Sequence, residues 1–288
     1  MATITAADVK KLRDQTGAGM MECKSALTEA SGDFEEANTI LRKRGLASAA
    51  KKASRATTEG LIGNRLSADR ATGILVEVNC ESDFVARTSD FQRLVQDVLT
   101  EIEKAGDAAD QAWLKDPNGP IQMRLAAGIA KLGENMAVPR FVRYAGQGYV
   151  GQYIHMDGKI GVQVELVGAT PVVAGREEFT TLVKEIAMQI AAASPTYVSR
   201  QTVPADVLAK EKSIYRAQME MSGKPANVID KIVDGKLGSF YSQVVLTDQA
   251  SIRDPKTTVA DLISATTKAL GAVVTVSRLV RFKVGEAA

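Results

Sequence analysis

The sequence predicts an α+β protein: an amino-terminal three-helix domain, a core of two related hairpin-plus-helix subdomains, and an inserted helical hairpin. Three observations support this fold class. Helix caps and glycines divide residues 1–55 into helices, and a hairpin-plus-helix pattern occurs twice in the middle of the chain. A Ser-Gly-Lys-Pro turn separates two helical stretches after residue 197. Apolar periodicity and turn residues therefore agree on the same three parts.

The first unit reads as three short helices. Thr5 and Asp8 form a capping box, and each later boundary carries a glycine or another cap. The expected helices run from Thr5 to near Gln15, from Met20 to Gly32, and from Asp33 to Gly45. Such short helices need one shared apolar core.

A glycine pair joins the first two helices. Gly17 and Gly19 precede Lys24-Ser25, an arrangement similar to a phosphate-binding loop. The glycine required before the lysine is replaced by Cys23, and a helix rather than a strand precedes the loop. The pair therefore predicts a tight helix-to-helix turn that exposes a surface for a partner.

Residues 42–55 are rich in Lys, Arg, Ala and Ser. A basic run of this kind can contact phosphates, but no aromatic residue is interleaved for base stacking. A solvated helix end and linker is the favoured interpretation, and an RNA-binding module stays as an alternative.

An internal repeat appears when the chain is compared with itself at an offset of 88 positions. Each copy predicts a β-hairpin followed by an amphipathic helix. The first hairpin turns near residues 68–71, and the second at Asp157-Gly158. The matched residues include Gly60, Gly63, Gly73, Glu77, Phe91 and Val95, which fall on Gly148, Gly151, Gly161, Glu165, Phe179 and Val183.

Asp83-Phe84 lies between a predicted strand at residues 73–78 and a helix at 89–104. An aromatic residue in such a connection either plugs the core or projects toward a partner. The second copy has Pro171-Val172 here, without an acid or an aromatic ring. Because the repeat unit closes without that bulk, a functional role for Asp83-Phe84 is favoured.

The remainder of the chain predicts a helical hairpin and a final helix and strand. Helices at 207–221 and 228–237 flank the Gly-Pro turn, and a helix ending at Gly271 precedes a strand at 272–284. The expected seam of the hairpin consists of Ile214, Met219, Met221, Ile229, Ile232 and Val233. This hairpin packs on the body, grips a partner or forms a homodimer.

Composition excludes several classes of function. The chain has 288 residues, 45% of them hydrophobic, and a net charge of +2. No membrane span or signal-peptide core is visible, and two cysteines fit a reducing cytoplasm, so we expect a cytoplasmic protein. A single histidine, His155, excludes sites with two histidine ligands, and we expect no metal or cofactor. We also expect no enzyme, although a mechanism based on a carboxylate or a lysine stays as an alternative.

Two motifs resemble a known family. LRDQTGAGMMECKSAL at residues 12–27 and EVNCESDFVAR at 77–87 are similar to the two signatures of bacterial elongation factor Ts. The resemblance implies a ubiquitin-associated-like (UBA-like) first domain, a coiled-coil insertion, and guanine-nucleotide exchange on elongation factor Tu, without membrane or direct nucleic-acid binding. The expected domains are 1–55, 56–147, 148–196 with 242–288, and the insertion 197–241.

The resemblance also implies roles for individual residues. The loop that disturbs the partner's magnesium site corresponds to Ser82, Asp83, Phe84 and Val85, where Ser82 replaces the family's threonine. Other expected contacts with elongation factor Tu are Leu12, Gly17, Met20, Met21, Lys24, Leu132, Gly133 and His155.

Two departures from the family concern the carboxyl-terminal part. The sequence ends at Ala288 without the further helix of some members, and Arg253 stands where an apolar residue is expected beside Ile252.

A helical scaffold that binds a different protein is the other alternative function. Its activity would depend on the first domain or the insertion rather than on Phe84.

Overall fold

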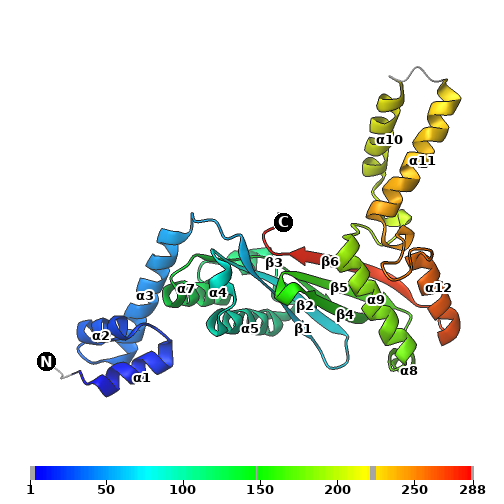
Figure 1. The fold of residues 1–288 in the computed structure, drawn as a ribbon. Helices are drawn as coiled ribbons and strands as arrows, with labels where there is room; N and C mark the ends of the chain where they lie inside the picture. The colour runs from blue at the N-terminus through cyan, green and yellow to red at the C-terminus, as the bar shows by residue number, and fades with distance from the viewer. Residues whose placement is uncertain (1–3, 147, 221–224, 287–288) are drawn as a thin grey trace.

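The computed structural model describes residues 4–146, 148–220 and 225–286. It confirms the α+β class: two antiparallel three-stranded sheets, with strand orders β1-β2-β3 and β4-β5-β6, carry helices on their outer faces. Figure 1 shows an elongated molecule with the amino-terminal helices at one end and a helical hairpin projecting near the other. None of the helices in these ranges combines the length and apolar character needed to cross a membrane.

The amino-terminal unit contains α1 (Ala6–Thr16), α2 (Met20–Glu29) and α3 (Phe34–Lys52). The Thr5–Asp8 capping box is present. The predicted end of the third helix at Gly45 is wrong, because α3 continues to Lys52. Gly45 is buried against α7 (Pro120–Leu132), and a Cβ there would lie 3.6 Å from the Ala126 carbonyl oxygen. Packing between the two helices therefore overrides the glycine signal.

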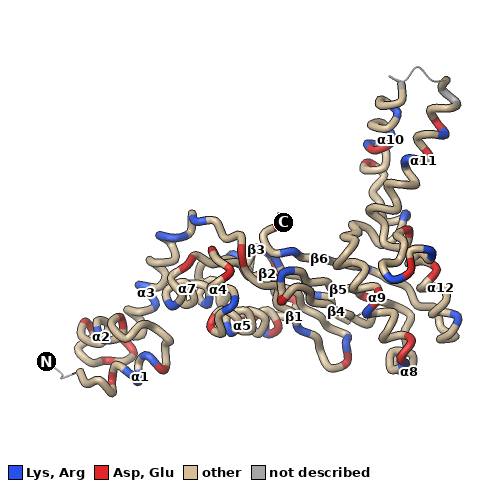
Figure 2. The backbone as a smooth tube through the Cα atoms, in the orientation of Figure 1, with Lys and Arg blue, Asp and Glu red and all other residues tan. Residues whose placement is uncertain are grey.

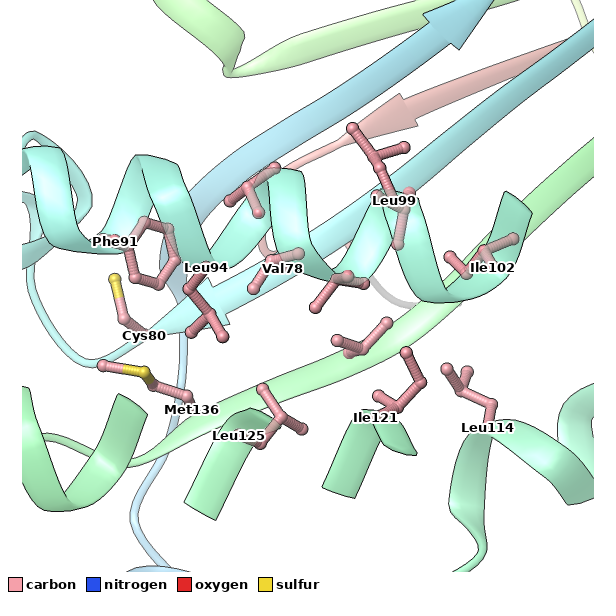
Figure 3. Packing of buried hydrophobic residues seen from close by; sticks show 14 of the residues in the cluster. Val78, Cys80, Phe91, Leu94, Leu99, Ile102, Leu114, Ile121, Leu125 and Met136 are labelled. Atoms are coloured by element: carbon pink, nitrogen blue, oxygen red, sulfur yellow. The ribbon is translucent and has the colours of Figure 1, made fainter. Parts of the chain in front are cut away.

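The first sheet carries the larger core. It consists of β1 (Glu59–Leu66), β2 (Thr72–Cys80) and β3 (Met136–Ala145), covered by α5 (Ser89–Ala105) and α7. Figure 3 shows Phe91, Leu94 and Leu99 of α5 packed between the sheet and the α7 side chains. The short elements here are α4 (Asp83–Ala86), η1 (Gly106–Ala108) and α6 (Gln111–Lys115). β3, α6 and α7 were not predicted from the sequence.

The second sheet repeats this plan. Its strands are β4 (Tyr149–His155), β5 (Ile160–Val167) and β6 (Thr275–Lys283). The helix α9 (Glu177–Ala193) covers this sheet, α12 (Val259–Leu270) packs against α9, and the one-turn helix α8 (Pro171–Ala174) precedes α9. Short turns are η2 (Met156–Gly158), η3 (Arg200–Thr202) and η4 (Leu246–Asp248). Both predicted hairpins, the final helix and the final strand are confirmed.

The two sheets pack against each other reciprocally. A Cβ on Gly73 would lie 2.5 Å from Val150 Cγ1, and a Cβ on its counterpart Gly161 would lie 2.3 Å from Ile62 Cγ2. Val150 and Ile62 are themselves counterparts in the repeat. Each copy therefore presents the same glycine to the same position of the other copy, which is the geometry of a two-fold axis.

The inserted hairpin consists of α10 (Ala205–Glu220) and α11 (Ala226–Val244). Its seam contains Ile229, Val233 and Leu237. Ile214 was expected in this seam but is 40% exposed, because Leu208, Tyr215, Met219 and Tyr241 provide the facing side chains. Met221 lies outside the described residues.

Candidate functional site

The Asp83-Phe84 motif forms a one-turn helix on the surface. The Ser82 hydroxyl accepts a 3.4 Å hydrogen bond from the Val85 amide and caps α4, which begins directly after β2. The Phe84 side chain is 80% exposed, whereas Phe91, seven residues later, is fully buried and fills the core (Figure 3). Phe84 therefore does not plug the core, so that alternative is wrong.

The second copy forms the same turn with different tip residues. Thr170 caps α8 by accepting from the Val173 amide at 3.3 Å, and Val172 is 80% exposed at the position equivalent to Phe84. The backbone of this turn therefore exposes the side chain at this position to solvent in both copies. The first copy uses that position for a large aromatic ring, and the second for a small aliphatic group.

Asp83 makes an ion pair with Arg87 along the turn. The Arg87 Nη2 to Asp83 Oδ2 distance is 2.8 Å, and the Arg87 side chain is 78% exposed. Exposed pairs of this kind contribute about 0–1 kcal/mol to folding. Asp83 is therefore available to a partner at little structural cost.

Glu134 binds the backbone just before α4. Its Oε2 accepts hydrogen bonds from the amides of Glu81 at 3.1 Å and Ser82 at 3.0 Å, and its Oε1 accepts one from the Ser82 hydroxyl at 2.5 Å. Glu134 was not predicted from the sequence, because it lies 52 positions from Ser82 and in no recognised motif.

The neighbouring segment at the end of α7 contains Leu132 and Gly133. Gly133 terminates the helix in the left-handed conformation with a φ of 81°, and Glu134 follows directly. On the other side of Glu134, the Asn135 backbone amide donates a 2.6 Å hydrogen bond to Glu81 Oε1. Residues 132–135 and 81–84 thus form one connected surface, although they are far apart in the sequence.

The turn between α1 and α2 lies beside the last turn of α7. A Cβ on Gly17 would lie 3.8 Å from Lys131 Cδ, and Lys131 makes a 2.7 Å ion pair with Asp90 at the start of α5. Met20 and Met21 are 45% and 74% exposed. The end of α7 therefore connects the glycine turn to the beginning of α5.

Lys24 and Leu12 differ in accessibility. Lys24 is exposed on α2, whereas Leu12 is fully buried in the amino-terminal core. Leu12 packs in this core, against which Ala18 of the glycine turn also lies, and it exposes no surface to a partner in this structure.

His155 lies apart from these segments, at the end of β4. Its Nδ1 is 3.0 Å from the Tyr153 hydroxyl, and the side chain is exposed. The following turn, at Asp157 and Gly158, shares an open groove with Arg93 of α5. Within the part of the chain that the structure describes, His155 makes no contact with residues 81–84.

Within the described ranges, no group of three or more His, Cys, Asp or Glu side chains is arranged to hold a metal ion. Burial, reinforced by the negative charge of Glu134, raises the pKa of Cys80 to about 12, so this thiol stays protonated. Figure 2 shows basic residues along the carboxyl-terminal part of α3, where Arg44 pairs with Glu29. Arg55, which follows this helix, pairs with Glu81.

The region around Ile252 contains one exposed apolar side chain. Ile252 is 47% exposed, and Arg253 beside it makes an ion pair with Glu185 of α9. The arginine is thus occupied within this part of the protein.

Comparison with known proteins gives a consistent result. The family model described as elongation factor TS matches residues 81–286. Elongation factor Ts of Trichlorobacter lovleyi is 44% identical over 289 residues, covering 98% of this chain and 93% of the relative. The elongation factor Ts proteins of Nautilia profundicola and Aquifex aeolicus are 45% and 41% identical, covering 99% and 96% of this chain and 94% and 97% of their own.

Proposed function

The chain belongs to the elongation factor Ts family, and we propose that it binds GDP-bound elongation factor Tu and promotes the release of GDP. Membership in this family makes the protein a translation elongation factor. The observation that carries the mechanistic proposal is the exposed Phe84 on a turn held by three hydrogen bonds to Glu134. The protein acts as an exchange factor that makes and breaks no covalent bond.

The proposed contact surface has four parts. Residues 82–85 enter the nucleotide-binding domain of elongation factor Tu beside its magnesium site, and Leu132 and Gly133 contact it next to this turn. Gly17, Met20, Met21 and Lys24 bind a second area of the partner, with Leu12 supporting their turn. His155 contacts a further domain of the partner. The proximity of Lys131 to Gly17 and its ion pair with Asp90 support a joint action of the amino-terminal turn and the end of α7.

The energetics require a broad interface. A ten-thousandfold acceleration of GDP release corresponds to roughly 5.5 kcal/mol of differential stabilisation. Burying one phenylalanine supplies only about 1.5–3 kcal/mol. Phe84 therefore acts together with contacts that hold the partner in a shape with low nucleotide affinity. By thermodynamic linkage, GDP weakens binding of the factor by the same ratio as the factor weakens binding of GDP.

We propose four structural parts for the chain, as predicted from the sequence. They are the first domain at 1–55, the two core subdomains at 56–147 and at 148–196 with 242–288, and the insertion at 197–241. The reciprocal packing of the sheets supports the two-subdomain core. A homodimer through α10 and α11 stays a prediction, and sedimentation of the full chain tests it.

Stopped-flow release of a fluorescent GDP from elongation factor Tu tests the function. Wild type is expected to accelerate release, and Phe84→Ala to lower that rate about 10- to 100-fold by losing one buried ring. Val172→Ala is the matched control, because it trims the equally exposed tip of the second copy. No acceleration by wild type would contradict the exchange function. Equal rates for wild type and Phe84→Ala would contradict only the role of Phe84.

A further inference from the structure

The Phe84 turn is fixed from a distant part of the chain. Glu134 accepts three hydrogen bonds, two from the Glu81 and Ser82 amides and one from the Ser82 hydroxyl, at 3.1, 3.0 and 2.5 Å. Hydrogen bonds to a charged acceptor are the strong ones in proteins. Because all three bonds precede α4, they determine the direction in which the turn and its exposed ring leave the sheet.

The internal repeat shows that a turn of this kind forms without a carboxylate. The two sheets align through the ion pairs of their buried glutamates, Glu77–Arg140 in the first and Glu165–Arg278 in the second. This alignment places Ala272 at the position of Glu134. Thr170 still caps α8 there, with its hydroxyl 3.3 Å from the Val173 amide. A single capping hydroxyl is therefore enough to form the turn.

The carboxylate occurs in the copy that carries the aromatic tip. The copy that ends in Val172 has an alanine in its place. If the three bonds were needed only to close the fold, the second copy would need them as well. Their restriction to the first copy indicates that they serve the exposed ring.

We infer that Glu134 is a positioning residue for exchange: it holds Phe84 in the orientation that enters the partner and connects this turn to the Leu132–Gly133 contact. The inference rests on the proposed exchange function. Pre-organisation of the turn removes the cost of ordering it in the step that releases GDP, so loss of the bonds lowers the maximal rate of release. The rest of the interface is unchanged, so the factor concentration at half-maximal rate changes little.

The test measures fluorescent GDP release from elongation factor Tu against factor concentration for wild type, Glu134→Ala, Glu134→Gln, Phe84→Ala and Phe84→Ala/Glu134→Ala. We expect Glu134→Ala to lower the maximal rate about tenfold, equivalent to about 1.4 kcal/mol. Its half-saturating concentration should stay within about twofold of wild type. Glu134→Gln should recover most of the rate, because its amide oxygen still accepts from the backbone and its amide nitrogen donates to the Ser82 hydroxyl.

The double variant separates positioning from general stability. If Glu134 acts through Phe84, Phe84→Ala/Glu134→Ala should release GDP as fast as Phe84→Ala alone. Multiplied losses in the double variant, or a Glu134→Ala rate equal to wild type, would overturn the inference. The proposed function fails separately, when wild type itself gives no acceleration.

A second variant covers the case in which Glu134→Ala does not fold. Ser82→Ala removes the 2.5 Å bond to Glu134 Oε1, together with the 3.4 Å cap on the Val85 amide, and leaves the two backbone amides bound to Glu134. It should lower the maximal rate by a smaller factor and add no further loss to Phe84→Ala. A rate equal to wild type for Ser82→Ala would then count against the inference.

Discussion

The side-chain amide of Asn64 donates a 3.0 Å hydrogen bond to Oε1 of Gln152, its own counterpart 88 positions later. Counterparts meet at a two-fold axis, so this bond marks the axis that relates the two hairpins. Gln152 Nε2 also donates to the Ile74 carbonyl at 2.8 Å. The repeat is therefore a packing relationship as well as a pattern in the sequence.

The close approach of the sheets predicts that Gly73→Ala and Gly161→Ala both destabilise the protein. Each added methyl group would lie within 2.5 Å of an atom of the opposite copy. Overpacking of this kind costs about 1–3 kcal/mol, measured by urea unfolding. Gly235→Ala in α11 is the control, because nothing lies within 4 Å of its added Cβ. That helical position should gain about 0.5–1 kcal/mol, and equal behaviour of all three variants would contradict the packing argument.

The two members of the Asp83–Arg87 pair should differ in their effect on exchange. The backbone before α4 is bound by Glu134, so Asp83 is not needed to orient it. We expect Asp83→Asn to slow GDP release and Arg87→Gln to leave it close to wild type. Both should change the free energy of unfolding by less than about 1 kcal/mol, because the pair is exposed. Equal slowing by the two variants would instead assign Asp83 an orienting role through Arg87.

Glu165 predicts an acid-dependent loss of stability. Burial alone would raise the pKa of this carboxyl, but hydrogen bonds from Arg278 and Ser277 and the Arg278 charge hold it below its ordinary value of 4.5. A lowered pKa in the folded state stabilises at pH values above 4.5, and this contribution disappears as the pH falls through the lowered value.

The measurement compares urea unfolding of wild type and Glu165→Gln. Wild type should be more stable by about 1–3 kcal/mol at neutral pH, and the difference should shrink toward pH 3. Glu177→Gln, at an exposed position of α9, is the control. A difference between wild type and Glu165→Gln that grows as the pH falls would refute the assignment.

Cys80 should resist thiol reagents while the protein is folded. Burial raises its pKa to about 12, and its Sγ donates to the Ser82 carbonyl at 3.1 Å. At pH 8 the thiolate fraction is then about one in ten thousand, and the thiolate is the reactive form. In a Cys23→Ser background, labelling with iodoacetamide should be negligible natively and complete in urea. Rapid native labelling would show that the segment before α4 opens.

The sequence predicted the parts of the fold that local signals determine. The Thr5 cap, the Asp157-Gly158 turn and the helix stop at Gly271 are short-range features, and all are present. Gly45 was misread because its meaning depends on α7, which lies about 80 residues further along. β3 was not predicted, because it is an edge strand that pairs only with β2, more than 50 residues earlier in the sequence.

The candidate site divides in the same way. The exposed position of Phe84 follows from the strand-to-helix turn and the contrast with Val172, both readable in the sequence. The role of Glu134 rests on three hydrogen bonds to residues 81 and 82, which lie more than 50 positions earlier. The apolar periodicity of the sequence does not indicate such bonds. Long-range polar contacts of this kind become visible only in three dimensions.

The α10–α11 hairpin leaves and re-enters the body at one place, where the amides of Thr196 and Tyr197 both donate to the Val244 carbonyl at 2.9 Å. Its two ends are already joined by the backbone of the body, so its length is set independently of the sheets. The hairpin is thus a separable insertion. Its length can change, or a short linker can replace it, without a change in the register of either sheet.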